Sequence, residues 1–83
     1  MTFGRFLVVE RTRLDLSQAE MARHLGISRA RLCDLEKGRQ LASVTLALKI
    51  AKKGNLSPRV AVASCLQDQL AKAKVHWKVD LVA

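Results

Sequence analysis

The sequence has few cysteines, no long apolar run and few acidic residues, and each shortage argues against particular classes of protein. The two cysteines, Cys33 and Cys65, lie far apart and form no CxxC pair, so they predict neither a disulfide framework nor a zinc site. No apolar run reaches the roughly 20 residues that span a bilayer. Charges are scattered through residues 1–16, so we expect no secretion signal. These absences favour a cytoplasmic protein with reduced thiols and no bound metal.

The shortage of acidic residues leaves a strongly basic chain. Its 83 residues include 7 Asp and Glu against 15 Lys and Arg, which gives a net charge of +8. Such a balance favours a polyanion as partner, with nucleic acid ahead of an anionic membrane surface. A chain of this length buries one small core but does not also enclose a substrate pocket. We therefore expect neither an enzyme nor a cofactor, since the core uses the apolar residues.

Apolar spacing and capping residues predict two helices in the first third of the chain. The first spans about residues 2–14 and is followed by a break. Ser17 begins the second helix, and Glu20, three residues later, completes an S-x-x-E capping box. Gly26 ends this helix, because glycine adopts the left-handed conformation at little cost.

A third helix spans residues 29–37, with Ser28 as its N-cap and Gly38 as its stop. On a helical wheel, Leu32 and Leu35 point toward the core, and the other face forms an arc about 140° wide. The residues in that arc are Arg29, Ala30, Cys33, Asp34 and Lys37. The turn before this helix is too short for an antiparallel hairpin, so the second and third helices should cross steeply. That crossing projects the third helix as reading of a major groove requires.

Two further helices are expected before residue 74. The fourth begins at Ser43 and ends at Gly54 and Asn55. Its expected buried stripe comprises Val44, Ala47, Leu48, Ile50 and Ala51. Ser57 and Pro58 open the fifth helix, because proline is tolerated at the first helical position.

The last stretch, VHWKVDLV, is typical of a β-strand because apolar residues alternate with polar ones. The apolar positions are Val75, Trp77, Val79 and Leu81. No second strand is expected elsewhere in the chain, so the partner should be the same strand of a second copy, antiparallel about a two-fold axis. We expect Val62, Leu66 and Leu70 of the fifth helix to belong to the same dimer interface. The alternative is that this stretch extends the fifth helix.

A set of residues in register matches one known family. These residues are Phe3-Gly4, Leu7, Arg11, Leu16-Ser17-Gln18, Ala22, Gly26, Ile27-Ser28, Leu32, Leu35-Glu36 and Gly38. With them the chain, from Phe3 to about Ile50, resembles the Cro and phage-repressor type of helix-turn-helix proteins, also called the Xre family. It departs from that family at Ala42, where members often have proline, and at Gly54, where they often have a large apolar residue.

The resemblance implies roles for individual residues. The third helix is then the recognition helix, whose base-reading residues are Arg29, Ala30, Cys33 and Asp34. The implied phosphate contacts are Gln18, Ser28, Arg31, Lys37, Arg39 and Ser43. The resemblance also implies a salt bridge from Arg11 in the first helix to Glu36 at the end of the third.

The expected fold is an all-α, five-helix domain of this repressor type with a short C-terminal strand that pairs across a homodimer. Residues 1–56 are expected to bind DNA and residues 57–83 to dimerise. The resemblance implies a cytoplasmic repressor that binds double-stranded DNA at a palindromic operator. Two alternatives stay open: an antitoxin that also binds a toxin, and a protein-interacting or RNA-binding module of the same fold.

Overall fold

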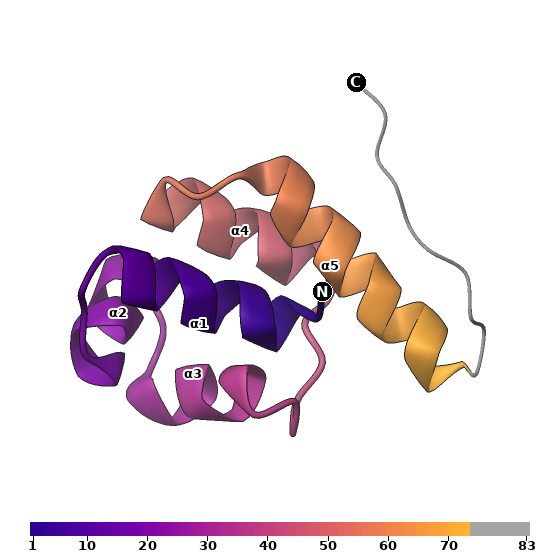
Figure 1. Cartoon of the computed structure of the whole chain (residues 1–83), viewed down its shortest axis with the longest axis horizontal. Coiled ribbons are helices and arrows are strands. Elements are labelled where there is room, and N and C mark those ends of the chain that lie inside the picture. The colour runs from indigo at the N-terminus through magenta and orange to yellow at the C-terminus, as the bar shows by residue number, and fades with distance from the viewer. Residues whose placement is uncertain (74–83) are drawn as a thin grey trace.

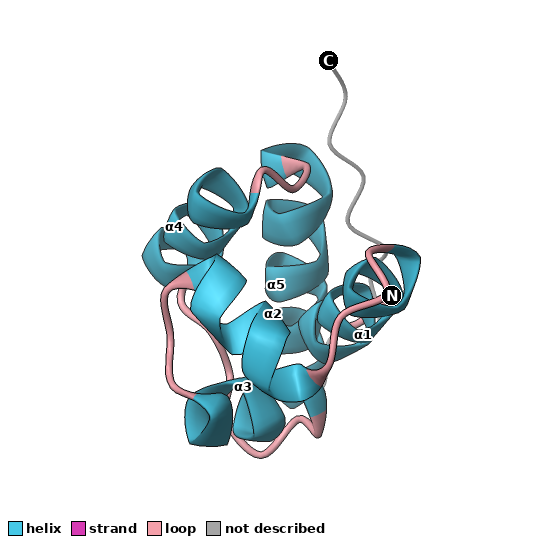
Figure 2. Ribbon diagram, turned by 90° about the vertical axis from the view of Figure 1, so that its left-hand side faces the viewer, coloured by secondary structure: helices cyan, strands magenta, loops and turns pink. Residues whose placement is uncertain are grey.

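The computed structural model describes residues 1–73, which form five α-helices and no strand, so this part of the fold is all-α (Figure 1, Figure 2). The helices are α1 (Phe3–Arg13), α2 (Gln18–Leu25), α3 (Arg29–Glu36), α4 (Val44–Gly54) and α5 (Pro58–Lys72). Their positions confirm the five helices expected from the sequence. The predicted strand, with Val75, Trp77, Val79 and Leu81, lies outside the described residues.

Side-chain caps begin each of these helices. Thr2 caps α1 by accepting the backbone N–H of Arg5 at 3.0 Å. The other four helices each follow a serine whose hydroxyl accepts the backbone N–H three residues later, and these serines are Ser17, Ser28, Ser43 and Ser57. The carboxylate of Glu20 in turn accepts the backbone N–H of Ser17, which confirms the predicted capping box. Each cap contributes about 1 kcal/mol, so the helix starts are encoded within a few residues.

The ends of α2 and α4 are also determined by single residues close to them in the sequence. Gly26 after α2 and Asn55 after α4 adopt the left-handed conformation, with φ of 72° and 54°. Leu56 is buried between Asn55 and the start of α5, which places the boundary between α4 and α5. At the end of α4, Gly54 packs against α2, because a Cβ there would lie only 2.5 Å from Leu25 Cδ2. The departure from the family at this position therefore lets α4 approach α2 closely.

Each of the five helices packs mainly against two others. Helix α1 packs against α3 on one side and α5 on the other, while α4 packs against α2 and α5 (Figure 1). In the turned view of Figure 2, α3 lies at the end of the molecule opposite the start of α5. Helix α3 therefore has one side on the body of the domain and the other side toward solvent.

A single core draws on all five helices. Its large, fully buried side chains are Phe3, Leu7, Met21, Leu32, Leu35, Ile50 and Cys65. One expectation for α4 is wrong, because Leu48 is 43% exposed. The residues of α4 that face the core are Ala47, Ile50 and Ala51, and Leu48 lies about 110° around the helix from the centre of that arc. The buried stripe of α4 is therefore narrower than the apolar pattern predicts.

Candidate nucleic-acid interface

A tight turn joins α2 to α3. Gly26 takes the left-handed conformation, and the N–H of Ile27 donates to the carbonyl of Ala22 at 3.0 Å. Ser28 follows at once as the cap of α3. Ala22 is buried, so the two helices approach closely where they cross. This is the helix, short turn and second helix that the sequence predicts.

The two sides of α3 differ sharply. Leu32 and Leu35 are buried, with exposed fractions of 0% and 2%. Of the four predicted base-reading residues, Arg29 and Ala30 are exposed, and Cys33 and Asp34 are half-buried. By helical periodicity all four share the side of α3 opposite the two leucines. The structure therefore brings the predicted base-reading residues together on one accessible face.

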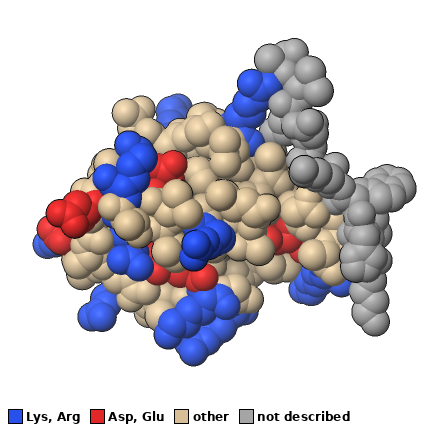
Figure 3. Space-filling view, in the orientation of Figure 1, with Lys and Arg blue, Asp and Glu red and all other residues tan. Residues whose placement is uncertain are grey.

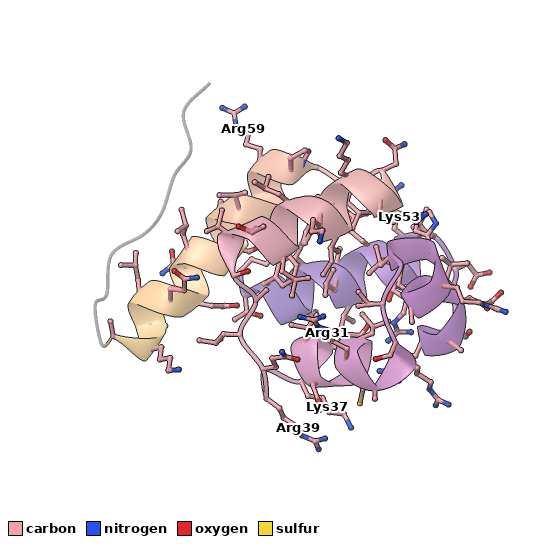
Figure 4. The ribbon with its side chains drawn as sticks, turned by 180° about the vertical axis from the view of Figure 1, so that it is seen from behind. Arg31, Lys37, Arg39, Lys53 and Arg59 are labelled. Carbon is pink, nitrogen blue, oxygen red and sulfur yellow. The ribbon has the colours of Figure 1, made fainter. Side chains whose placement is uncertain are left out.

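Basic residues flank this face. Lys37 and Arg39 project from the end of α3 and from the loop that follows it (Figure 4), and both are exposed. In Figure 3, Lys and Arg gather along the lower edge of the molecule, where α3 lies. Arg39 also faces the carboxylate of Asp34, with Nη1 and Oδ1 3.7 Å apart. Exposed pairs of this kind contribute less than about 1 kcal/mol, so Arg39 can exchange this carboxylate for a phosphate.

Three of the other residues predicted to contact phosphates already form hydrogen bonds within the protein. The side-chain amide of Gln18 donates to Glu36 Oε1 at 3.0 Å, and the hydroxyls of Ser28 and Ser43 accept backbone N–H groups at 3.1 Å. A hydroxyl that accepts still has its own proton to donate, and an amide nitrogen has two. These three side chains therefore keep donors for a phosphate. Arg31 lies between α3 and α4, apart from Lys37 and Arg39 (Figure 4).

A partly buried ion pair fixes the end of α3. Arg11 donates to Glu36 from Nε at 2.9 Å and from Nη2 at 3.3 Å, which confirms the salt bridge implied by the family. The sequence did not reveal two further contacts at this junction. Gln18 binds the same carboxylate, and Gly4 packs directly on the backbone carbonyl oxygens of Leu35 and Glu36. Both contacts hold α3 against α1 and α2.

Three lysines of α4 also lie near α3 but were not predicted as site residues. Lys49, Lys52 and Lys53 line the same groove as Arg31. The i, i+3 and i+4 spacing of these lysines places them on one side of the helix, and this was the only signal in the sequence that could have identified them. The groove has no counterpart among the expectations drawn from the sequence.

The two thiols differ in their surroundings. Cys65 is buried and its Sγ donates to the carbonyl oxygen of Ala42 at 2.9 Å. Burial, and secondly the nearby carboxylate of Asp68, raise the pKa of the Cys65 thiol, so it stays protonated at neutral pH. Cys33 is half-buried on α3. Within residues 1–73, no group of three or more His, Cys, Asp or Glu side chains is placed to hold a metal ion.

The predicted dimer residues of α5 occupy one side of that helix. Val62, Leu66 and Leu70 are half-buried and follow one another at i+4 spacing. Each keeps apolar surface that a second protein could cover, and their role in a dimer stays a prediction. No helix in the described part of the chain is long and apolar enough to cross a membrane.

Comparison with known proteins identifies the central part of the chain. The model of the helix-turn-helix family matches residues 10–60, which include α2, the turn, α3 and α4. The comparisons with curated proteins and with solved structures gave no match. The family match indicates a DNA-binding transcription regulator whose partner is double-stranded DNA.

Proposed function

The chain belongs to the Cro and C1 type, or Xre family, of helix-turn-helix proteins, and on this premise we propose that it represses transcription by binding a palindromic operator as a homodimer. The observation that supports this proposal is the division of α3 into a buried leucine side and an accessible side flanked by cations. A cytoplasmic location follows from that role.

Each residue on the accessible side suits a different contact in a major groove. Arg29, in the first turn, can donate two hydrogen bonds to guanine O6 and N7. The methyl group of Ala30 can pack on a thymine methyl, and Asp34 can accept from cytosine N4. Cys33 stands between them as a small, weakly polar neighbour of the bases.

The proposed phosphate contacts surround this face. Lys37 and Arg39 are exposed at the end of α3 and after it, where they can neutralise the backbone of one strand. Ser28 and Ser43 each retain a hydroxyl proton to donate, and Gln18 stands at the first position of α2, where the helix dipole attracts an anion. These contacts set the register of α3, and the base contacts then select the sequence.

A dimer supplies the second half-site. We assign dimerisation to residues 57–83, which contain Val62, Leu66 and Leu70 on one side of α5 and the predicted strand beyond it. Two α3 helices related by a two-fold axis would read an inverted repeat. The centres of its half-sites would lie about 10 base pairs, one helical turn, or a multiple of that distance apart.

Selection of genomic DNA fragments by the purified full chain tests this function. We expect a few strongly enriched fragments that share an inverted repeat, and a titration of that site should show at least about a thousandfold preference over random duplex. Single-stranded RNA at the same ionic strength should compete poorly. Enrichment without a shared sequence, or better competition by RNA than by duplex DNA, would contradict the proposal.

A further inference from the structure

An open groove of about 890 Å³ lies beside the recognition helix, between the α2–α3 turn and α4. We call it the α4 groove. Its apolar floor consists of Leu25, Ile27, Leu46 and Ile50. Leu25 and Ile50 are buried, whereas Ile27 and Leu46 are only half-buried. The groove therefore leaves apolar surface in contact with water.

The rim of the α4 groove is basic. It is formed by Arg31 from α3 and by Lys49, Lys52 and Lys53 from α4, and all four are exposed. None of these four side chains forms an ion pair with an acidic residue in the described part of the chain. Like charges at i+3 and i+4 spacing repel one another. The rim therefore favours an anionic partner from outside residues 1–73.

The position of the groove separates it from the proposed base-reading face. Figure 4 shows Arg31 and Lys53 on the α4 side of α3, whereas Lys37 and Arg39 project from another edge. The stem of Lys53 also lies over the turn, since a Cβ at Gly26 would be 3.5 Å from Lys53 Cγ. Cations and apolar groups thus face the same space from two helices and the turn.

We propose that the α4 groove binds an acidic segment of a partner protein, in which apolar side chains alternate with Asp or Glu. Such a segment satisfies both parts of the groove, because its carboxylates pair with the rim and its apolar side chains cover Ile27 and Leu46. A DNA phosphate would pair with the cations of the rim but would leave the apolar side chains of the floor exposed to water. This inference goes beyond operator binding and does not depend on it.

A direct binding experiment on the full chain tests the proposal with two fluorescent peptides of equal length and charge. Both contain Glu at every second position, and the positions between them are Leu in one peptide and Ser in the other. Fluorescence anisotropy should show at least about fivefold tighter binding of the Leu peptide. Equal affinities would mean that only charge is recognised, and would overturn the proposal.

Matched variants locate the binding site. The double variant Lys49→Ala, Lys52→Ala should bind the Leu peptide about fivefold to tenfold more weakly. The control double variant Arg5→Ala, Lys72→Ala removes the same charge at exposed positions outside the groove and should bind nearly as well as the parent chain. Alanine preserves helix propensity at these sites, and circular dichroism checks the fold.

Two results would overturn the assignment of this groove. Equal reductions of peptide affinity in both double variants would show that net charge alone attracts the peptide. Alternatively, the lysine variant could keep its peptide affinity and instead bind random duplex DNA more weakly, with a shallower salt dependence. That outcome would make Lys49 and Lys52 phosphate contacts.

Discussion

The guanidinium of Arg11 and the carboxylate of Glu36 form a two-point ion pair that joins α1 to the end of α3. The Glu36 side chain is only 5% exposed and that of Arg11 is 25% exposed. The amide of Gln18 binds the same carboxylate from the start of α2. One acidic side chain thus sets the position of α3 relative to two other helices.

Replacing Glu36 with Ala should lower the free energy of unfolding by about 2 to 4 kcal/mol, because Arg11 and Gln18 lose their common acceptor while partly buried. The matched control is Glu10→Ala, which removes the exposed pair between Glu10 and Arg13 and should cost less than about 1 kcal/mol. Denaturant unfolding measures both changes. Similar reductions in the two variants would contradict a special role for Glu36.

The variant Gly4→Ala should also destabilise the domain, by about 1 to 3 kcal/mol. The added Cβ would lie 2.8 Å from the carbonyl oxygen of Glu36 and would also collide with that of Leu35. Both atoms belong to the backbone, so α1 and α3 must separate. The control Arg5→Ala changes an exposed neighbour on the same helix and should be nearly neutral. An unchanged melting temperature for Gly4→Ala would refute the close approach of the two helices.

On the proposed function, Arg29→Ala should weaken binding to the selected operator by about 1 to 3 kcal/mol and relax the preference at one base pair in each half-site. Binding to random duplex should change little. Lys37→Ala is the comparison, because removal of a cation that neutralises a phosphate should weaken binding to both kinds of DNA alike and reduce the salt slope by about 0.9. An effect of equal size on both DNAs for Arg29→Ala would make Arg29 a phosphate-binding residue.

The stability of the domain should depend on pH through Asp68. Burial raises the pKa of this carboxyl, although the N–H of Phe3, which donates to it at 3.0 Å, and the terminal amino group act in the opposite direction. Its folded-state pKa therefore lies above the unfolded value of about 3.9. The native state binds the proton more tightly, so the contribution of Asp68 to stability falls as pH rises from the unfolded pKa through the folded one.

The variant Asp68→Asn keeps an acceptor for Phe3 but does not titrate. The free energy of unfolding of the parent chain minus that of the variant should therefore decrease as pH rises from below about 4 and become constant above the folded pKa. Urea unfolding across this pH range measures the difference. An increase in the difference with rising pH would mean that the hydrogen bond from Phe3 outweighs burial.

The proposed dimer makes a further prediction about residues 75–83. Removing them should convert the dimer to a monomer that retains α1 to α5, and sedimentation measures the mass. Binding to a full inverted repeat should then show a shallower salt dependence, by about 0.9 for each phosphate that the protein no longer neutralises. If the truncated chain still sediments as a dimer, the interface must lie on α5, where Val62, Leu66 and Leu70 are the candidates.

The sequence by itself determined where the helices begin and end, and which face of α3 is accessible. The helix caps and stops act on backbone groups within a few residues of themselves, as at Ser17, Ser28, Gly26 and Asn55. Their effects can therefore be predicted from the sequence alone. The periodicity of Leu32 and its neighbours likewise separates the two sides of α3 without reference to other helices. The ion pair of Arg11 was anticipated only because of the family pattern.

Only the tertiary structure decided how the helices turn toward one another. The exposure of Leu48, the bond from Gln18 to Glu36 and the gathering of Arg31 with three lysines of α4 all depend on the rotation of one helix against the next. That rotation is set by how the whole core packs, including the contact of Gly4 with α3. Close packing depends on many side chains at once, so the rotation of the helices cannot be predicted from a local sequence pattern.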